Sequence, residues 1–255
     1  MSGHSKWATT KYRKAAQDAK RSALFSKLSR NITVAAKEGG DPNPENNASL
    51  AAAVAKAKSY SLPKDKIDTA IKKAFGTGSD SAKFENVVYE GYGPAGVAIY
   101  VEALTDNRNR TAADVRSAFS HSGGNLGTTG SVAFQFERKG QIAVEKSQSP
   151  DEDEFMMLVA EAGGDDYEDA EEEWVVITAP TELVNVKKGL EDAGVEAKGY
   201  ELIMQPTTPT EVGVSDAKKV LRLIDRLEEL EDLQNVYHTM DMTDEIAAAL
   251  GTVGE

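Results

Sequence analysis

The side chains best suited to chemistry in this sequence are the cations close to its beginning. Between residues 6 and 30, Asp18 is the only acid, and the indole of Trp7 directly follows Lys6. Ammonium and guanidinium groups bind phosphates, and an indole can stack on a base. The alternative is a solvated basic helix with Trp7 packed against a helical core. The predicted nucleic-acid contacts are Lys6, Trp7, Lys11, Arg13, Lys14, Lys20, Arg21, Lys27 and Arg30.

Two more arginines occupy positions from which a guanidinium could reach a phosphate. Arg108 and Arg110 lie in the segment DNRNR, between a predicted strand and a predicted helix. We include both in the predicted contact surface. Local ion pairs with Asp106 and Asp114 are the alternative.

The charge of the chain is divided unevenly along its length. The formal net charge of −13 argues against a nucleic-acid partner, because phosphates repel an acidic protein. However, residues 1–78 hold 15 Lys and Arg against 6 Asp and Glu, a net of +9, and residues 79–255 hold 14 against 36, a net of −22. This asymmetry indicates a basic contact module joined to an acidic body.

Catalysis has few candidate side chains. The only histidines are His4, His121 and His238, which are far apart in the sequence, and the carboxylates occur in runs typical of solvated faces. His121 ends a predicted helix, where the helix dipole favours a cation. We therefore predict no catalytic residue and no enzymatic activity.

Two glycine-rich segments, GYGPAG and HSGGNLGTTG, raise the question of a phosphate-binding loop. The first joins two predicted strands, and the second precedes a strand and lacks the Gly-Lys-Ser/Thr ending. We interpret both segments as shaped turns. We therefore predict no nucleotide cofactor and no small-molecule substrate.

Neither metal binding nor membrane insertion is predicted. The chain has no cysteine and no EF-hand loop. The start Ser2-Gly3-His4 offers a square-planar nitrogen set for Cu(II) or Ni(II), which we interpret as incidental. No stretch approaches the ~18 consecutive apolar residues of a membrane span, and the first residues lack the apolar core of a signal peptide. These features predict a soluble cytoplasmic protein.

The elements that must position the basic residues are helices. Within residues 11–37, apolar residues recur every three to four positions, which predicts a helix. A second helix is predicted over residues 48–59, with Asn46 or Asn47 as its cap. A third helix follows closely, with Ser61 as its predicted N-cap.

The pattern changes to strands after the helices. The segments NVVYEGYG and VAIYVEALT predict a hairpin, followed by a helix over residues 111–121 and a strand over residues 132–136. Residues 140–205 then follow the order strand, helix, strand, strand, helix, strand, which is the split ferredoxin-like arrangement. A helix over residues 215–230, a strand over residues 235–238 and a short closing helix over residues 243–250 come last.

One strand and one helix cannot bury a core alone, so we expect the tail to return to the first hairpin. The predicted fold class is α+β, with an N-terminal helical domain followed by two α/β sandwich domains. One of these is ferredoxin-like and is inserted in the other. The predicted domains are 1–80 for the basic helical domain, 81–137 plus 206–250 for the α/β domain, and 138–205 for the inserted domain.

Four segments of the sequence resemble a known family. SGHSKW at residues 2–7, with Lys11, Arg13 and Lys14 after it, is similar to the opening of the YebC/PmpR family. NITVAAKEGGDPNPENN, YEGYGPAGVAIYVEALTDNRNRT and GGNLGTTGSVAFQFERKG resemble further long motifs of that family, and the resemblance extends to the tail. Tyr12 stands where the family pattern has histidine, which leaves the basic character of the segment intact.

The resemblance implies a helical domain, two α/β domains and a nucleic-acid role. Family members are described as probable transcriptional regulators that bind promoter DNA, and relatives are linked to translation, where they assist ribosomes on stretches such as consecutive prolines. The implied partner is therefore promoter DNA, or ribosomal RNA on the ribosome. No helix-turn-helix is recognised in the sequence, and an acidic body suits basic ribosomal proteins, so both partners stay open. An acidic protein-binding adaptor without a nucleic-acid role is the third alternative.

Overall fold

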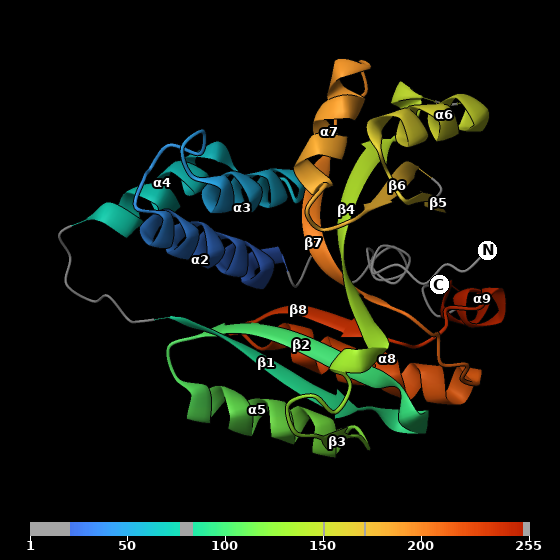
Figure 1. Cartoon of the computed structure of the whole chain (residues 1–255). Coiled ribbons are helices and arrows are strands. Elements are labelled where there is room, and N and C mark those ends of the chain that lie inside the picture. Colours follow the sequence, from blue (N-terminus) through green and yellow to red (C-terminus); the bar gives the residue numbers. More distant parts are fainter. Residues whose placement is uncertain (1–20, 77–83, 150, 171, 252–255) are drawn as a thin grey trace. The chain divides into compact units, whose positions relative to one another are not determined.

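The computed structural model describes residues 21–76, 84–149, 151–170 and 172–251 (Figure 1). These residues form helices and two antiparallel four-stranded sheets. The predicted α+β class is therefore confirmed.

The chain divides into two compact units, each described by itself below. The first unit consists of the first sheet with its helices, and the second holds most of the N-terminal helices and the second sheet. The first unit comprises residues 1–27, 78–137 and 204–255, and the second comprises residues 28–77 and 138–203.

Three consecutive helices precede the first sheet: α2 (Arg21–Gly39), α3 (Ala48–Ser59) and α4 (Lys64–Phe75). Each helix buries small and aliphatic side chains at helical spacing. The hydroxyl of Thr33 on α2 donates to the carbonyl of Ala70 on α4 at 2.9 Å, which ties these two helices together.

Asn47 closes the turn between α2 and α3. Its buried side chain accepts a 3.0 Å hydrogen bond from the amide of Leu50, as an N-cap does. Its side-chain nitrogen also donates to the carbonyls of Ala35 at 3.0 Å and Asp41 at 3.2 Å. Of the two predicted capping residues, Asn47 is therefore the one that caps α3.

The predicted N-cap at Ser61 is wrong, because Pro63 occupies the cap position of α4. Ser61 has a φ of 59°. Its amide donates to the carbonyl of Lys58, and the amide of Leu62 donates to the carbonyl of Ala57. This pair of bonds forms a Schellman motif, so Ser61 ends α3 and does not begin α4.

The first sheet is built around the predicted hairpin. β1 (Glu85–Tyr92) pairs with β2 (Ala98–Thr105) through a connection that contains the short 3-10 helix Pro94–Gly96. β3 (Asn125–Leu126) flanks β1, and β8 (Leu233–His238) flanks β2. The strand order is therefore β3-β1-β2-β8.

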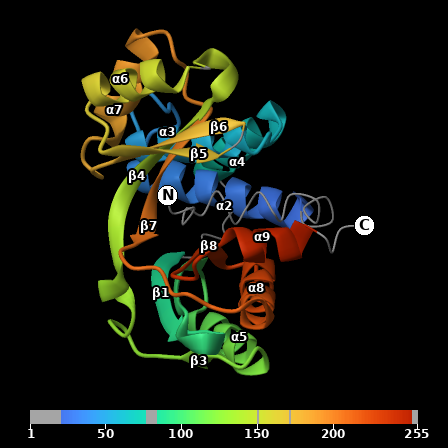
Figure 2. The same cartoon turned by 90° about the vertical axis from the view of Figure 1, so that its right-hand side faces the viewer.

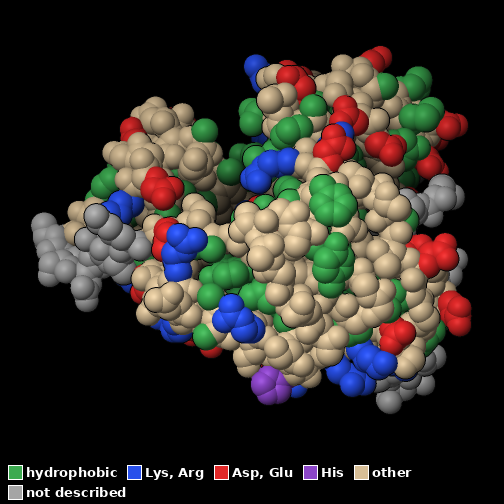
Figure 3. Space-filling view, turned by 60° about the horizontal axis from the view of Figure 1, so that its bottom comes forward, with side chains coloured by type: hydrophobic (Ala, Val, Ile, Leu, Met, Phe, Trp, Pro, Cys, Tyr) green, Lys and Arg blue, Asp and Glu red, His purple; other side chains and the backbone are tan. Residues whose placement is uncertain are grey.

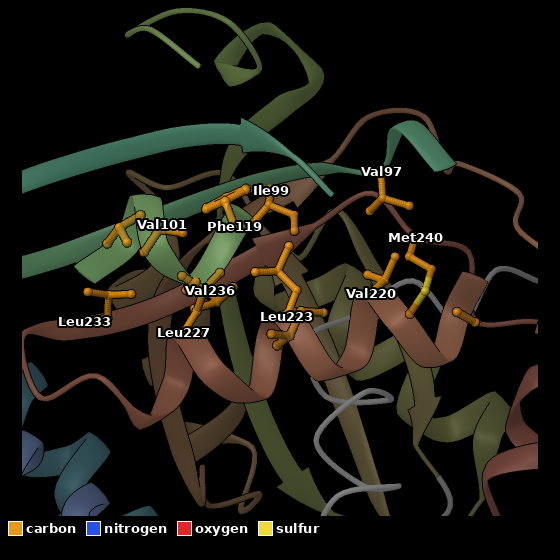
Figure 4. Packing of buried hydrophobic residues seen from close by; sticks show 14 of the residues in the cluster. Val97, Ile99, Val101, Phe119, Val220, Leu223, Leu227, Leu233, Val236 and Met240 are labelled. Atoms are coloured by element: carbon orange, nitrogen blue, oxygen red, sulfur yellow. The ribbon is translucent and has the colours of Figure 1, made fainter. Parts of the chain in front are cut away.

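Two helices, α5 (Arg108–His121) and α8 (Val214–Glu229), cover one face of this sheet (Figure 2). Phe119 of α5 and Leu223 of α8 are fully buried with Ile99 of β2 in one apolar cluster (Figure 4). A final helix, α9 (Asp244–Gly251), adds Ile246 to the same cluster. This cluster fixes the two longer helices side by side.

The predicted strand over residues 132–136 is wrong in most of its length. Residues Ala133–Gln135 form a 3-10 helix, and β4 (Phe136–Glu145) begins only afterwards. The amides of Val132 and Ala133 both donate to the side-chain carboxylate of Glu90, so they are withdrawn from strand pairing. β4 also contains the strand that was predicted as the first element of residues 140–205.

The second sheet has the predicted ferredoxin-like connectivity, with strand order β5-β6-β4-β7. Phe155 and Trp174 stack in its core with ring centroids 5.2 Å apart, and the Trp174 indole nitrogen donates to the carbonyl of Ser149 at 2.8 Å. The remaining elements are α6 (Glu152–Ala162), β5 (Asp166–Ala170), β6 (Glu173–Thr178), α7 (Leu183–Asp192) and β7 (Gly199–Pro206).

The second sheet interrupts the first one along the chain. The chain leaves through β4 and returns through β7, which are neighbours in the second sheet. Where they reach the first unit, the amide of Thr207 donates to the carbonyl of Gln135 at 2.9 Å. The chain then forms α8 and places β8 beside β2, so the predicted insertion of one sandwich into the other is confirmed.

Candidate nucleic-acid interface

Most of the basic residues predicted near the chain start lie outside the described residues. This applies to the possible Ser2-Gly3-His4 metal site and to Lys6, Trp7, Lys11, Arg13, Lys14 and Lys20. Arg21 is the first residue of α2, and Lys27 and Arg30 follow on the same helix. The predicted contact surface can therefore be examined on α2 and at the start of α5.

Lys27 has an internal partner. Its side chain is only 9% exposed, and its ammonium donates to the backbone carbonyl of Glu228 at 2.5 Å. Burial of a charged group is costly unless it is hydrogen-bonded, so this contact stabilises the buried ammonium. Arg30, about one turn further along α2, is half-buried. The Lys27 side chain thus stabilises the fold by joining α2 to the carbonyl of Glu228.

The three helices also carry exposed lysines that the motif-based prediction did not single out. These lysines contribute to the net charge of +9 of residues 1–78, and this charge is the sequence signal that could have identified them. Asp65 and Asp68 on α4 are exposed beside some of them. The exposed lysines of this region are Lys37, Lys58, Lys64, Lys66, Lys72 and Lys73.

Arg110 is held by two carboxylates. Its guanidinium donates to Asp106 and to Asp232, each at 2.8 Å. The oxygen of Asp232 that it contacts also accepts from the hydroxyls of Thr111 at 2.7 Å and Thr105 at 3.2 Å. Hydrogen bonds to Asp232 and then to Asp106 raise the pKa of Arg110 above its ordinary value. Arg110 is therefore a permanently charged group that anchors the start of α5.

Arg108 is more open to a ligand than Arg110. Its side chain is 64% exposed, and its nearest carboxylate, Glu85, lies 3.6 Å away. Its carbonyl accepts a 3.3 Å hydrogen bond from the hydroxyl of Tyr89, whose pKa is raised because the hydroxyl is partly buried. The first turn of α5 contains Arg108 and Arg110 and no acid. This arrangement is unfavourable, because the helix dipole disfavours cations at a helix N-terminus. Asp106 forms an ion pair with Arg110, as anticipated by the alternative prediction of local ion pairs.

The glycine-rich segment after α5 is shaped by the buried carboxylate of Glu90. This carboxylate accepts hydrogen bonds from the amides of Gly130 at 2.7 Å and of Val132 and Ala133 at 2.8 Å. The carbonyl of Glu90 accepts from the amide of Gly127 at 2.8 Å. Amides that are bound in this way are not available to a phosphate, in agreement with the prediction of a shaped turn.

The same arrangement presents Phe134 to solvent. This side chain is 73% exposed, on the 3-10 helix that follows the Glu90 contacts. Tyr92, also partly exposed, donates to the carbonyl of Ser131 at 3.1 Å and accepts from the side chain of Gln135 at 3.0 Å. Phe134 was overlooked because it lay within a predicted strand. An exposed aromatic ring on an ordered turn can stack on an unpaired base.

The described histidines do not form a reactive group. His121 ends α5, as predicted, and its Nδ1 lies 2.8 Å from the carbonyl of Ser117. Within the described ranges, no three His, Asp or Glu side chains are grouped to hold a metal ion. No helix of that part of the chain combines the length and apolarity needed to cross a bilayer.

Two family models together account for almost the whole chain. The model of the TACO1/YebC protein N-terminal domain matches residues 5–77, and that of the TACO1/YebC second and third domain matches residues 84–240. The chain belongs to the TACO1/YebC family. The predicted resemblance to the YebC group is thereby confirmed.

Relatives in the TACO1/YebC family match this chain from end to end. A protein of Rubrobacter xylanophilus is 50% identical over 97% of this chain and 98% of its own length. One of Bifidobacterium animalis subsp. lactis is 48% identical over 98% of this chain and 99% of its own length. Both are named "probable transcriptional regulatory protein".

A solved structure has the same fold. The crystal structure of a conserved hypothetical protein from Aquifex aeolicus matches with a TM-score of 0.80 and 42% identity, and the match covers 90% of this chain and 93% of that one. The arrangement of helices and sheets described above is thus similar to that of a protein whose structure has been solved.

Proposed function

We propose that this chain is a nucleic-acid-binding regulator of gene expression, acting as a DNA-binding regulator of transcription. The observation that carries the proposal is the full-length match to proteins named probable transcriptional regulatory proteins. The concentration of cations in residues 1–78 supports it, because phosphate contacts supply much of the affinity for DNA.

In this proposal the basic segment over residues 6–30 binds the phosphate backbone. Lys27 is excepted, because its ammonium already has a carbonyl partner inside the protein. Arg108 extends the contact, and Arg110 positions the helix that carries it. The three-domain division predicted from the sequence is retained, with the acidic domains orienting the basic one. The proposal assigns no catalytic step and no cofactor, and it places the protein in the cytoplasm.

The test compares two adjacent pairs of cations. Arg13→Glu with Lys14→Glu should weaken binding to a promoter duplex and reduce the dependence of binding on salt. Lys187→Glu with Lys188→Glu, on α7 of the acidic second sheet, is the matched control and should bind like the wild-type protein. Sequence-specific regulation also requires that the chain's candidate promoter duplexes outcompete random duplexes at physiological salt. Equal affinity for both would refute transcriptional specificity.

A second candidate function is favoured by the exposed ring of Phe134. Sequence-specific RNA recognition uses unpaired bases that stack on aromatic side chains, and duplex DNA offers no such bases. The alternative is therefore a ribosome-associated translation factor that contacts ribosomal RNA and assists the synthesis of difficult stretches such as consecutive prolines. The net negative charge of residues 79–255 suits contact with basic ribosomal proteins at least as well as it suits promoter DNA.

Co-sedimentation with ribosomes separates the two functions. The experiment uses the full chain at physiological salt with excess duplex DNA that includes candidate promoters. Retention on ribosomes, with loss of retention in Phe134→Ala, favours the translation factor. Release by DNA favours the transcriptional regulator. Phe75→Ala is a matched control, because Phe75 is also an exposed phenylalanine and lies on α4, which belongs to the other compact unit.

A further inference from the structure

The cations of the first sheet and its helices are confined to two elements. Residues 84–137 and 204–255 together contain seven Lys and Arg residues, and all seven lie on α5 or α8. Acidic residues are spread over strands, loops and helices of the same ranges. The cations of these ranges are therefore concentrated on two helices, which also carry Asp114, Asp216, Asp225, Glu228 and Glu229.

The two helices lie on the same side of the first sheet and share one apolar cluster. Their outward side chains therefore belong to one surface. Figure 3 views the molecule from the side on which α5 lies and shows Lys and Arg side chains there. We define the two-helix face by the cations that point away from the cluster: Arg108, Arg116, Lys218, Arg222 and Arg226, of which Lys218 is half-buried and the others are exposed.

Most of these charges have no carboxylate partner. Within the described part of the chain, no ion pair is formed by Arg116, Lys218, Arg222 or Arg226, and Arg108 has only the long contact to Glu85. The two cations left out of the definition are different, because Lys219 pairs with Asp216 at 2.8 Å and Arg110 pairs with two aspartates. The two-helix face thus presents uncompensated guanidinium groups to solvent.

The face also contains acids, and their positions limit its extent. Glu228 and Glu229 lie at the C-terminal end of α8, beyond Arg226, and each has an interaction elsewhere. Asp225 is half-buried and likewise engaged. Asp114 is the exposed acid of α5. The uncompensated cations therefore lie along the body of α8 and on the outward side of α5.

The spacing on α8 suits a repeating anion. Lys218, Arg222 and Arg226 recur at every fourth residue, which keeps them on one side of the helix. With a rise of 1.5 Å per residue, neighbouring cations are about 6 Å apart along the axis, so each can meet a different phosphate of one strand. Guanidinium groups bind phosphate oxygens in a bidentate manner.

The composition favours nucleic acid over an acidic protein as the partner. Among the described residues, none of the large hydrophobic side chains that are exposed lies on α5 or α8. Protein interfaces have an apolar or aromatic centre, whereas nucleic-acid interfaces are polar and strongly positive. The two-helix face resembles a nucleic-acid interface in having exposed cations and no exposed large hydrophobic side chain.

We propose that the two-helix face is a second phosphate-binding surface, which holds the backbone of the nucleic acid that the N-terminal segment also binds. The proposal rests on the proposed function and extends it from one contact module to two. Because the two modules are covalently linked, binding by one raises the effective concentration of the other.

The test is the salt dependence of binding by the full-length protein. Arg222→Gln with Arg226→Gln removes two charges from exposed positions, and glutamine preserves helix propensity. We expect weaker binding to a mixed-sequence DNA duplex and to an RNA hairpin. For the duplex, the slope of log K against log salt should decrease in magnitude by about 0.9 for each phosphate that the variant no longer neutralises. Arg116→Gln on α5 should reduce the slope independently. Lys188→Gln, at an exposed lysine of α7, is the matched control for Arg116→Gln and should leave the slope unchanged.

Wild-type slopes in both α5 and α8 variants would overturn the two-helix face, even if Arg13→Glu with Lys14→Glu abolishes binding and the proposed function stands. Failure of the wild-type protein to bind either nucleic acid would instead refute the proposed function. An unchanged slope together with loss of binding to polyglutamate in the α8 variant would also overturn the proposal, in favour of an acidic protein partner.

Discussion

The guanidinium of Arg110 donates a 2.8 Å hydrogen bond to the carboxylate of Asp232, across 122 residues of sequence. It connects the first turn of α5 to the turn between α8 and β8, because Asp232 immediately precedes β8. The same carboxylate oxygen accepts from the hydroxyls of Thr105 and Thr111, so the end of β2 is part of the junction. The two helices that carry the two-helix face are thereby joined at one end by a polar contact.

We predict that Asp232→Ala destabilises the first unit by about 1–3 kcal/mol, because buried hydroxyls lose their acceptor. Urea unfolding monitored by circular dichroism measures the change. Asp106→Ala is the control, since Asp106 is an exposed partner of the same arginine and its loss should cost less. Equal losses of stability in Asp232→Ala and Asp106→Ala would contradict the larger contribution assigned to the buried carboxylate of Asp232.

Glu90 should determine the order of the glycine-rich segment. In Glu90→Ala, three amides lose a buried acceptor, so we expect a loss of about 1–3 kcal/mol and faster hydrogen exchange at Gly130, Val132 and Ala133. Hydrogen exchange followed by nuclear magnetic resonance measures each amide separately. Glu85→Ala, on the exposed end of the same strand, should leave these three amides protected.

Asn47 has two roles that substitutions can separate. Asn47→Ala removes both the cap and the two donated hydrogen bonds, and should destabilise the helical region by about 2 kcal/mol. Asn47→Asp keeps the oxygen that caps α3 but cannot donate to the carbonyls of Ala35 and Asp41. Thermal unfolding should therefore rank Asn47→Asp between the wild-type protein and Asn47→Ala. An aspartate variant as stable as the wild type would assign the whole effect to the cap.

Lys198 gives a prediction for alkaline pH. Partial burial disfavours its charge, but the hydrogen bond and charge of Glu173, with a contribution from Glu145, outweigh this and raise the pKa of Lys198 above 10.5. A cation with a raised pKa stabilises the fold fully below its unfolded-state pKa, and that stabilisation is lost as pH rises through the folded-state value. The stability difference between the wild-type protein and Lys198→Met should therefore shrink only above pH 10.5 in chemical unfolding. A difference that already disappears near neutral pH would contradict the assignment.

Much of the fold was predictable because its signals are local. The helix that contains Val115 and Phe119 and the hairpin around Gly93 follow from apolar periodicity and turn chemistry. The return of β8 to the first sheet followed from the inability of one strand to bury a core. The errors at Ser61 and at residues 132–136 have the opposite origin, because a residue in left-handed conformation and a distant carboxylate decide those segments.

The candidate site was less predictable than the fold. Basic density near the chain start is visible in sequence, but the partner of Lys27 lies 201 residues away. An ion pair of Arg110 with Asp106 is anticipated from the sequence, but its bond to Asp232, 122 residues away, is visible only in the structure. The two-helix face was not recognised, because α5 and α8 are separated by the inserted sheet and their cations are diluted by acids in any linear count.

The bond between Gln135 and Thr207 bears on how this architecture could have arisen. It holds together the two points at which the chain leaves and re-enters the host sheet, and neither β4 nor β7 belongs to that sheet. A change in the length of the intervening segment therefore changes the loop-closure entropy little, because this cost grows only with the logarithm of the length. The apolar cluster of the host unit contains no residue of the inserted segment, so the architecture is compatible with acquisition of the acidic ferredoxin-like module as one piece.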